Sequence, residues 1–132
     1  MMPVSYRIDP SLECIFVTLQ GIITDEDLIK GQQSMFRDAL FEGRYSRLVV
    51  AMEVTKLVVT ADTVRSVAKA AVDRGLRKAA LVANSEVTYG VMRMYEGYAI
   101  DADCFVSRDA NEALAWLLGR PSSDGLSCAG AG

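Results

Sequence analysis

The chain has 132 residues, of which 51% are apolar and 23% charged, and its net charge is −3 with a pI near 4.9. These values are typical of one folded domain and exclude an intrinsically disordered chain. The basic residues are scattered, which argues against a nucleic-acid-binding protein. No apolar run reaches the roughly 20 residues that span a bilayer, so we expect no membrane insertion.

The sequence is poor in catalytic and metal-binding residue types. It contains no histidine, which removes the commonest general base and the commonest zinc ligand. Cys14, Cys104 and Cys128 form no CxxC pair and no metal-ligand spacing. Free cysteines, with no secretory signal at the N-terminus, favour a cytoplasmic setting. We therefore expect no catalytic residue, no metal, no cofactor and no enzymatic activity.

The first third of the chain predicts a hairpin and then a helix. Residues 4–8 and 14–19 read as strands on either side of a proline-containing turn, which predicts an antiparallel hairpin that ends at Gly21. Thr24, followed by three acidic residues, predicts an N-cap and a first helical turn. Apolar residues then recur at helical spacing as far as residue 40.

The rest of the chain alternates between buried strands and amphipathic helices. Residues 47–52 and 78–83 are short apolar runs typical of central strands. Thr60 and Ser85 predict the N-caps of two intervening helices. One of two interpretations of the second helix places Val91, Met94 and Tyr98 on the sheet and leaves Met92 and Tyr95 as isolated surface residues. A last strand at 103–107 and a helix that begins after Asp109 complete a domain over residues 1–119, with a flexible tail at 120–132.

The predicted element order is therefore β-β-α-β-α-β-α-β-α. It defines an α/β fold with a mixed, mostly parallel sheet, to which the first hairpin adds an antiparallel edge. In such sheets the carboxyl ends of the parallel strands are the usual place for ligands.

This order resembles that of the STAS domains, the fold of anti-sigma-factor antagonists. Four features carry the resemblance, which covers about residues 3–118: Ile8-Asp9-Pro10, the strand exit Gly21-Ile22-Ile23-Thr24, the Tyr95-Glu96 helix and residues 109–117. The chain is most similar to small stand-alone bacterial STAS-like proteins, whose functions are mostly unassigned.

The resemblance makes Thr60 a candidate phosphoacceptor. In the phosphorylated antagonists an aspartate and a phosphoacceptor serine stand just before the helix that follows the third strand. Thr60 falls at the place of that serine, whereas Val59 stands where the aspartate is expected and Ala51 stands near the place of a strand-end aspartate. A helix N-cap is the simpler interpretation of the same threonine.

Two further sets of residues follow from the predicted layout. A pocket for a small anion at the carboxyl edge is expected from Lys56, Asn84, Ser85, Tyr89 and Arg93. The helix from 89 to 98 is rich in residue types found in interface cores, and Gly90, Met92, Tyr95 and Gly97 predict a homodimer contact.

The leading hypothesis is a non-enzymatic regulatory or scaffolding module that acts through contacts with an unknown protein partner and with a second copy of itself. The alternative is a carrier of a small anion or lipid that uses the carboxyl-edge pocket.

Overall fold

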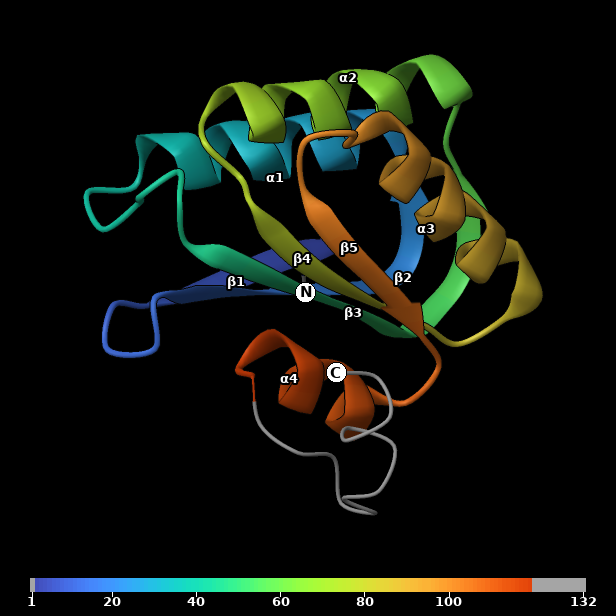
Figure 1. Cartoon of the computed structure of the whole chain (residues 1–132). Coiled ribbons are helices and arrows are strands. Elements are labelled where there is room, and N and C mark those ends of the chain that lie inside the picture. Colours follow the sequence, from blue (N-terminus) through green and yellow to red (C-terminus); the bar gives the residue numbers. More distant parts are fainter. Residues whose placement is uncertain (1, 120–132) are drawn as a thin grey trace.

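A five-stranded mixed sheet runs through the domain, in the spatial order β1-β2-β3-β4-β5 (Figure 1). The computed structural model describes residues 2–119, so the predicted tail lies outside the described residues. β1 and β2 form the predicted antiparallel hairpin, and all later pairs are parallel. The strands are Val4–Asp9, Cys14–Thr24, Ser46–Val58, Lys78–Ala83 and Asp103–Ser107.

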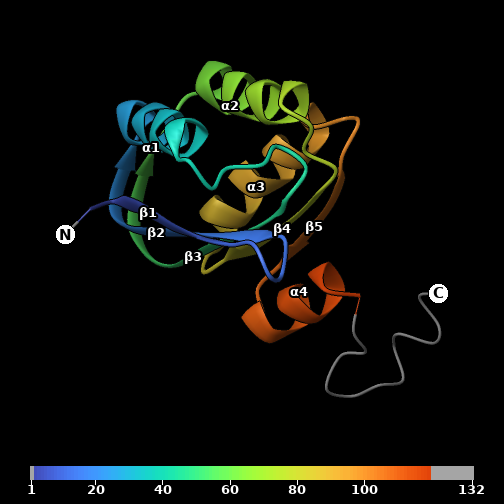
Figure 2. The same ribbon diagram turned by 90° about the vertical axis from the view of Figure 1, so that its left-hand side faces the viewer.

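The helices divide unequally between the two faces of the sheet. The four helices of the described chain are α1 (Asp25–Arg37), α2 (Ala61–Asp73), α3 (Glu86–Tyr98) and α4 (Ala110–Leu117). Successive parallel strands are direct neighbours, so right-handed crossovers place α1, α2 and α3 on one face. α4 follows the last strand and lies alone on the opposite face, as the rotated view shows (Figure 2).

Two strands are longer than the sequence predicted. β2 continues through Gly21, whose positive φ of 72° accompanies a shift in register, and pairing resumes from Ile22 to Thr24. β3 continues with it to Val58, although its pairing with β4 ends at Ala51. The ends of β2 and β3 therefore form a two-stranded arm, and the predicted stop at Gly21 was wrong because glycine accommodates the bulge without ending the strand.

The four predicted helix starts agree with the structure, whereas the predicted end of α1 does not. Thr24, Thr60, Ser85 and Asp109 are all N-caps whose side chains accept amide hydrogen bonds, as predicted. α1 instead stops at Arg37, three residues before the predicted end. Asp38 explains the difference, because its carboxylate accepts hydrogen bonds from the Tyr6 hydroxyl and the Leu40 amide, which holds the chain in a turn.

The inner face of α3 differs from the expected one. Met92 is 5% exposed and Thr88 is 3% exposed, whereas Met94 is 37% exposed. The interpretation that places Met94 on the sheet was therefore wrong. Thr88 allows this different helical phase, because its hydroxyl accepts a hydrogen bond from the N-cap Ser85 and is not left unpaired in the core.

Candidate functional site

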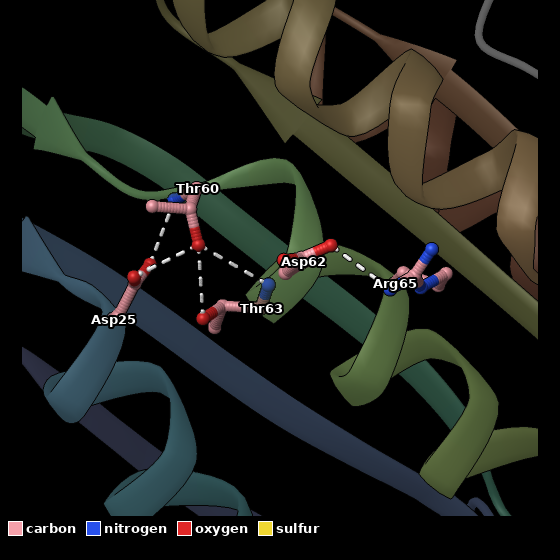
Figure 3. A network of polar contacts seen from close by, with 5 residues as sticks. All are labelled: Asp25, Thr60, Asp62, Thr63 and Arg65. Atoms are coloured by element: carbon pink, nitrogen blue, oxygen red, sulfur yellow. Dashed lines mark hydrogen bonds and ion pairs between the residues drawn. The ribbon is translucent and has the colours of Figure 1, made fainter.

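The predicted phosphoacceptor, Thr60, joins the starts of two helices (Figure 3). Its amide donates to Asp25 Oδ1 at 2.8 Å and its hydroxyl donates to Asp25 Oδ2 at 2.9 Å. The hydroxyl oxygen also accepts from the Thr63 amide at 3.3 Å, which makes Thr60 the N-cap of α2. Because Asp25 is the first residue of α1, this contact connects α1 to α2.

The carboxylate that contacts Thr60 comes from Asp25 and not from a residue next to Thr60 in the sequence. The hydrogen bond from the Thr60 amide lowers the pKa of Asp25, and the hydroxyls of Thr60 and Thr63 lower it further. Val59, which stands where the family has an aspartate, instead lines the interior of the domain. Linear spacing could not find Asp25, because it lies 35 residues away from Thr60.

The residues predicted to form a carboxyl-edge pocket have separate partners. Asn84 donates to the carbonyls of Met52 and Val54, and so covers the edge of β3 where β4 has ended. Ser85 caps α3, and Arg93 pairs with Glu96 at 2.9 Å. Lys56 is exposed on the arm formed by β2 and β3.

Tyr89, the fifth of these residues, lies in an open hollow on the surface. The hollow is lined by Glu86, Tyr89, Gly90, Val106, Ser107, Arg108 and Glu112. The guanidinium carbon of Arg108 lies 5.6 Å from the centre of the Tyr89 ring. None of the other four predicted residues lines this hollow, so the structure does not bring the five together in it.

The four residues of the predicted interface lie on opposite sides of α3. Met92 and Tyr95 line the interior of the domain, on the same side of α3 as the buried Thr88. Gly90 and Gly97 are exposed, and a Cβ atom built on either would meet no atom within 4 Å. Gly90 and Gly97 share the exposed face of α3 with Val87 and Met94, and we call these four residues the outer stripe; the exposed Glu86 and Arg93 lie beside it.

An apolar cavity that the sequence did not predict lies between the sheet and the three-helix layer. Its volume is about 130 Å³, and β2, β3, α1, α2 and α3 all contribute to its wall. Most of the wall is aliphatic, with Val17, Leu19, Val49, Val64 and Val91 among its residues. Among the described residues, no aspartate or glutamate lines it. Arg47, from the start of β3, is the cation among its lining residues.

Arg47 is buried, and only one of its three side-chain nitrogens donates hydrogen bonds within the described residues. Its side chain belongs to a residue only 2% exposed. Nη1 donates to the carbonyls of Gly43 and Tyr45, whereas Nε and Nη2 have no partner within the described residues. The ring of Phe41 lies 5.3 Å from its guanidinium carbon. Burial lowers the pKa of Arg47, although a guanidinium stays protonated at neutral pH.

The signal for this site was present in the sequence, as an arginine at the head of the apolar run that forms β3. A charged residue at the start of a strand is normally exposed, so the pattern alone did not mark it. Tyr95, on α3, lines the same cavity, and burial raises the pKa of its phenol to about 12 in spite of the Arg47 charge.

Nucleophilic and metal chemistry find little support in the described part of the chain. Burial raises the pKa values of the Cys14 and Cys104 thiols to about 11, so both are protonated at neutral pH and are poor nucleophiles. Residues 2–119 contain no group of three or more histidine, cysteine, aspartate or glutamate side chains placed to hold a metal ion. No helix within the same range is long and apolar enough to cross a membrane.

The architecture is that of a SpoIIAA-like domain, which confirms the STAS-like fold predicted from the sequence. A similar solved structure is that of an uncharacterized protein of the DUF3478 family with a SpoIIAA-like fold from Shewanella loihica PV-4. The two share 15% sequence identity with a TM-score of 0.61, over 89% of this chain and 95% of the other. No family model and no curated protein sequence matches the chain. At this identity the likeness shows the fold alone.

Proposed function

We propose that this chain is a non-enzymatic regulatory or scaffolding module that works through protein contacts, first of all with a second copy of itself. The observation that carries the proposal is the outer stripe of α3. Val87 is 68% exposed and Met94 is 37% exposed; Gly90 lies between them along the helix, and Gly97 lies one turn beyond Met94. A surface of this kind lets another helix backbone approach closely while apolar side chains pack on either side.

The two glycines are costly unless something occupies the space above them. A glycine inside a helix destabilises it by about 0.5–1 kcal/mol relative to alanine. Among residues 2–119, neither Gly90 nor Gly97 has a steric reason to lack a side chain, because a Cβ atom would meet no described atom within 4 Å. A partner backbone that packs against the outer stripe supplies that reason.

Sedimentation equilibrium tests the self-association directly. We expect a concentration-dependent dimer for the natural chain and a monomer for Gly97→Leu, since leucine is a better helix former and fills the point of close approach. Ser66→Leu is the matched control, because it adds the same side chain to the exposed face of α2 and should leave the dimer intact. A chain that stays monomeric at its solubility limit contradicts the proposal.

Regulation of this module is proposed to act at Thr60. A phosphate on the hydroxyl would carry close to two negative charges at neutral pH and would face Asp25, which now accepts its hydrogen bond. Repulsion between the two groups would break the connection between α1 and α2. Mass spectrometry of the chain purified from its own host tests this: phosphate on Thr60 supports it, and an unmodified Thr60 under all growth conditions contradicts it.

A small-ligand carrier is the second candidate function. The observation that favours it is the interior cavity with Arg47, rather than the carboxyl edge where the sequence placed a pocket. In either function the free thiols Cys14 and Cys104 suit a reducing, cytoplasmic setting.

A further inference from the structure

We propose that the cavity beneath the three helices binds an amphipathic carboxylate. The acid group would pair with the Nε–Nη2 edge of Arg47, and the apolar body would fill the space between the sheet and α1, α2 and α3. This inference goes beyond a function in protein contacts and does not depend on the outer stripe of α3.

The first argument is the geometry of the unpaired nitrogens of Arg47. A guanidinium is planar, and its Nε–H and one Nη2–H point in parallel from the same edge. That edge is the one left without a partner, while Nη1 is held by the carbonyls of Gly43 and Tyr45. Two parallel N–H donors match the two oxygens of a carboxylate. The main chain thus fixes the guanidinium and leaves its carboxylate-binding edge free.

The second argument is the absence of a counter-charge. Burying an unpaired cation is expensive, and proteins normally pair it with an acid or satisfy all of its donors. Within residues 2–119, no aspartate or glutamate contributes to the cavity wall. Its other polar side chains are largely committed, since Gln32 donates to the Val67 carbonyl and the Tyr6 hydroxyl is within 3.0 Å of the Asp38 carboxylate. An anion that enters from outside is the missing partner.

The third argument is the character and size of the remaining wall. Aliphatic side chains cannot satisfy a hydrated or strongly polar ligand, so the rest of the molecule must be apolar. An apolar cavity of about 150 Å³ in another protein accommodates benzene. The 130 Å³ here therefore suits a short or medium acyl chain or one aromatic ring. With Arg47 as the cation of the wall, a singly charged carboxylate fits better than a phosphate dianion.

Isothermal titration calorimetry with sodium octanoate, octan-1-ol and octyl phosphate tests the inference on the full chain. We expect octanoate to bind tightest, and roughly 10- to 100-fold tighter than octanol, because the alcohol cannot form the charge-assisted pair. Octanoate should also raise the melting temperature in a concentration-dependent way. The inference would be overturned if octanol bound as tightly as octanoate or if octyl phosphate bound more tightly. It would also be overturned if no probe bound, as expected when ordered water occupies the site.

Substitutions locate the binding within the molecule. Arg47→Met keeps an unbranched apolar stem but removes the guanidinium, and it should abolish octanoate binding, whereas Arg77→Met removes an exposed charge just before β4 and should leave binding unchanged. Arg93→Ala should also leave it unchanged, and loss of binding in that variant would move the site to the carboxyl edge. If Arg47→Met does not fold, Val67→Phe keeps the arginine and fills the cavity; it too should abolish binding, and retained binding would refute the site.

Discussion

The two faces of the sheet are packed in different ways. Under α4, the buried side chains Cys14, Leu48, Ala80, Val82, Ala113 and Leu117 form one cluster, which the rings of Phe105 and Trp116 extend by stacking 5.3 Å apart. The layer of α1, α2 and α3 on the other face is broader (Figure 2). A cavity of about 130 Å³ lies between this layer and the sheet. One short helix therefore covers a buried cluster on its part of the sheet, while three longer helices leave space above theirs.

The buried polar groups of the two faces also differ, in how completely they are hydrogen-bonded. On the α4 side, the buried Ser107 donates to the Glu112 carboxylate at 2.7 Å and accepts from the Asp109 amide at 2.9 Å. On the three-helix side, Arg47 has two nitrogens without partners. Close packing and complete hydrogen bonding are what a purely structural core requires. The face that lacks both is the one we assign to binding.

The largest difference between the faces should be seen when a leucine is truncated on each. Leu48 and Leu19 are both buried strand residues, but Leu48 packs under α4 and Leu19 borders the cavity. Leu48→Ala should cost about 4–5 kcal/mol and Leu19→Ala about 2–3 kcal/mol, since a side chain beside empty space has fewer contacts to lose. Urea unfolding measures both values, and equal costs would mean that the two faces are equally well packed.

A matched pair of enlargements gives a smaller effect but a sharper contrast. Val82 faces α4 and is fully buried, whereas Val49 lines the cavity one strand away. We expect Val82→Ile to destabilise the chain by about 1–3 kcal/mol through overpacking, and Val49→Ile to be neutral or stabilising because it fills empty space. Thermal unfolding of both variants checks this. A destabilising Val49→Ile would show that the space is not available to an added methyl group.

These packing differences explain what the sequence could and could not predict. Strand and helix identities, their order and the four N-caps depend on local patterns, and the structure confirms them from the hairpin to Asp109. The extension of β2 through Gly21 was missed because a local turn signal was overridden by pairing with β3. The phase of α3 was missed because Thr88 is polar and nonetheless buried.

The candidate sites depend on contacts between residues that are distant in sequence, which no local pattern contains. Thr60 was identified from its position before a helix, but its partner Asp25 could be found only in three dimensions. Arg47 carries a charge at the start of an apolar run, and only the structure shows that its guanidinium is covered. A cavity is the space left between side chains, so a sequence read for hydrophobic periodicity gives no measure of it.

The smallest expected effect concerns the link between α1 and α2 over the cavity. In the folded chain the Thr60 amide lowers the pKa of Asp25, so the folded state binds fewer protons there than the unfolded state. The stability from this group is therefore complete above the unfolded pKa of about 3.9 and is lost as the pH falls through the lower folded pKa. Asp25→Asn should destabilise the chain at neutral pH and make little difference in strong acid.

Urea unfolding of both proteins from neutral pH down to about pH 2.5 measures this difference, since that range passes through the unfolded pKa of about 3.9 and continues below it. The control is Asp62→Asn, which removes a carboxylate that contacts only the exposed side chain of Arg65 among the described residues and so contributes little. The difference in unfolding free energy between the natural chain and Asp25→Asn should shrink as the pH falls. If it does not, the charge of the Asp25 carboxylate does not hold Thr60. The link between α1 and α2 would then depend on apolar packing and on neutral hydrogen bonds such as that from Gln32 to the Val67 carbonyl.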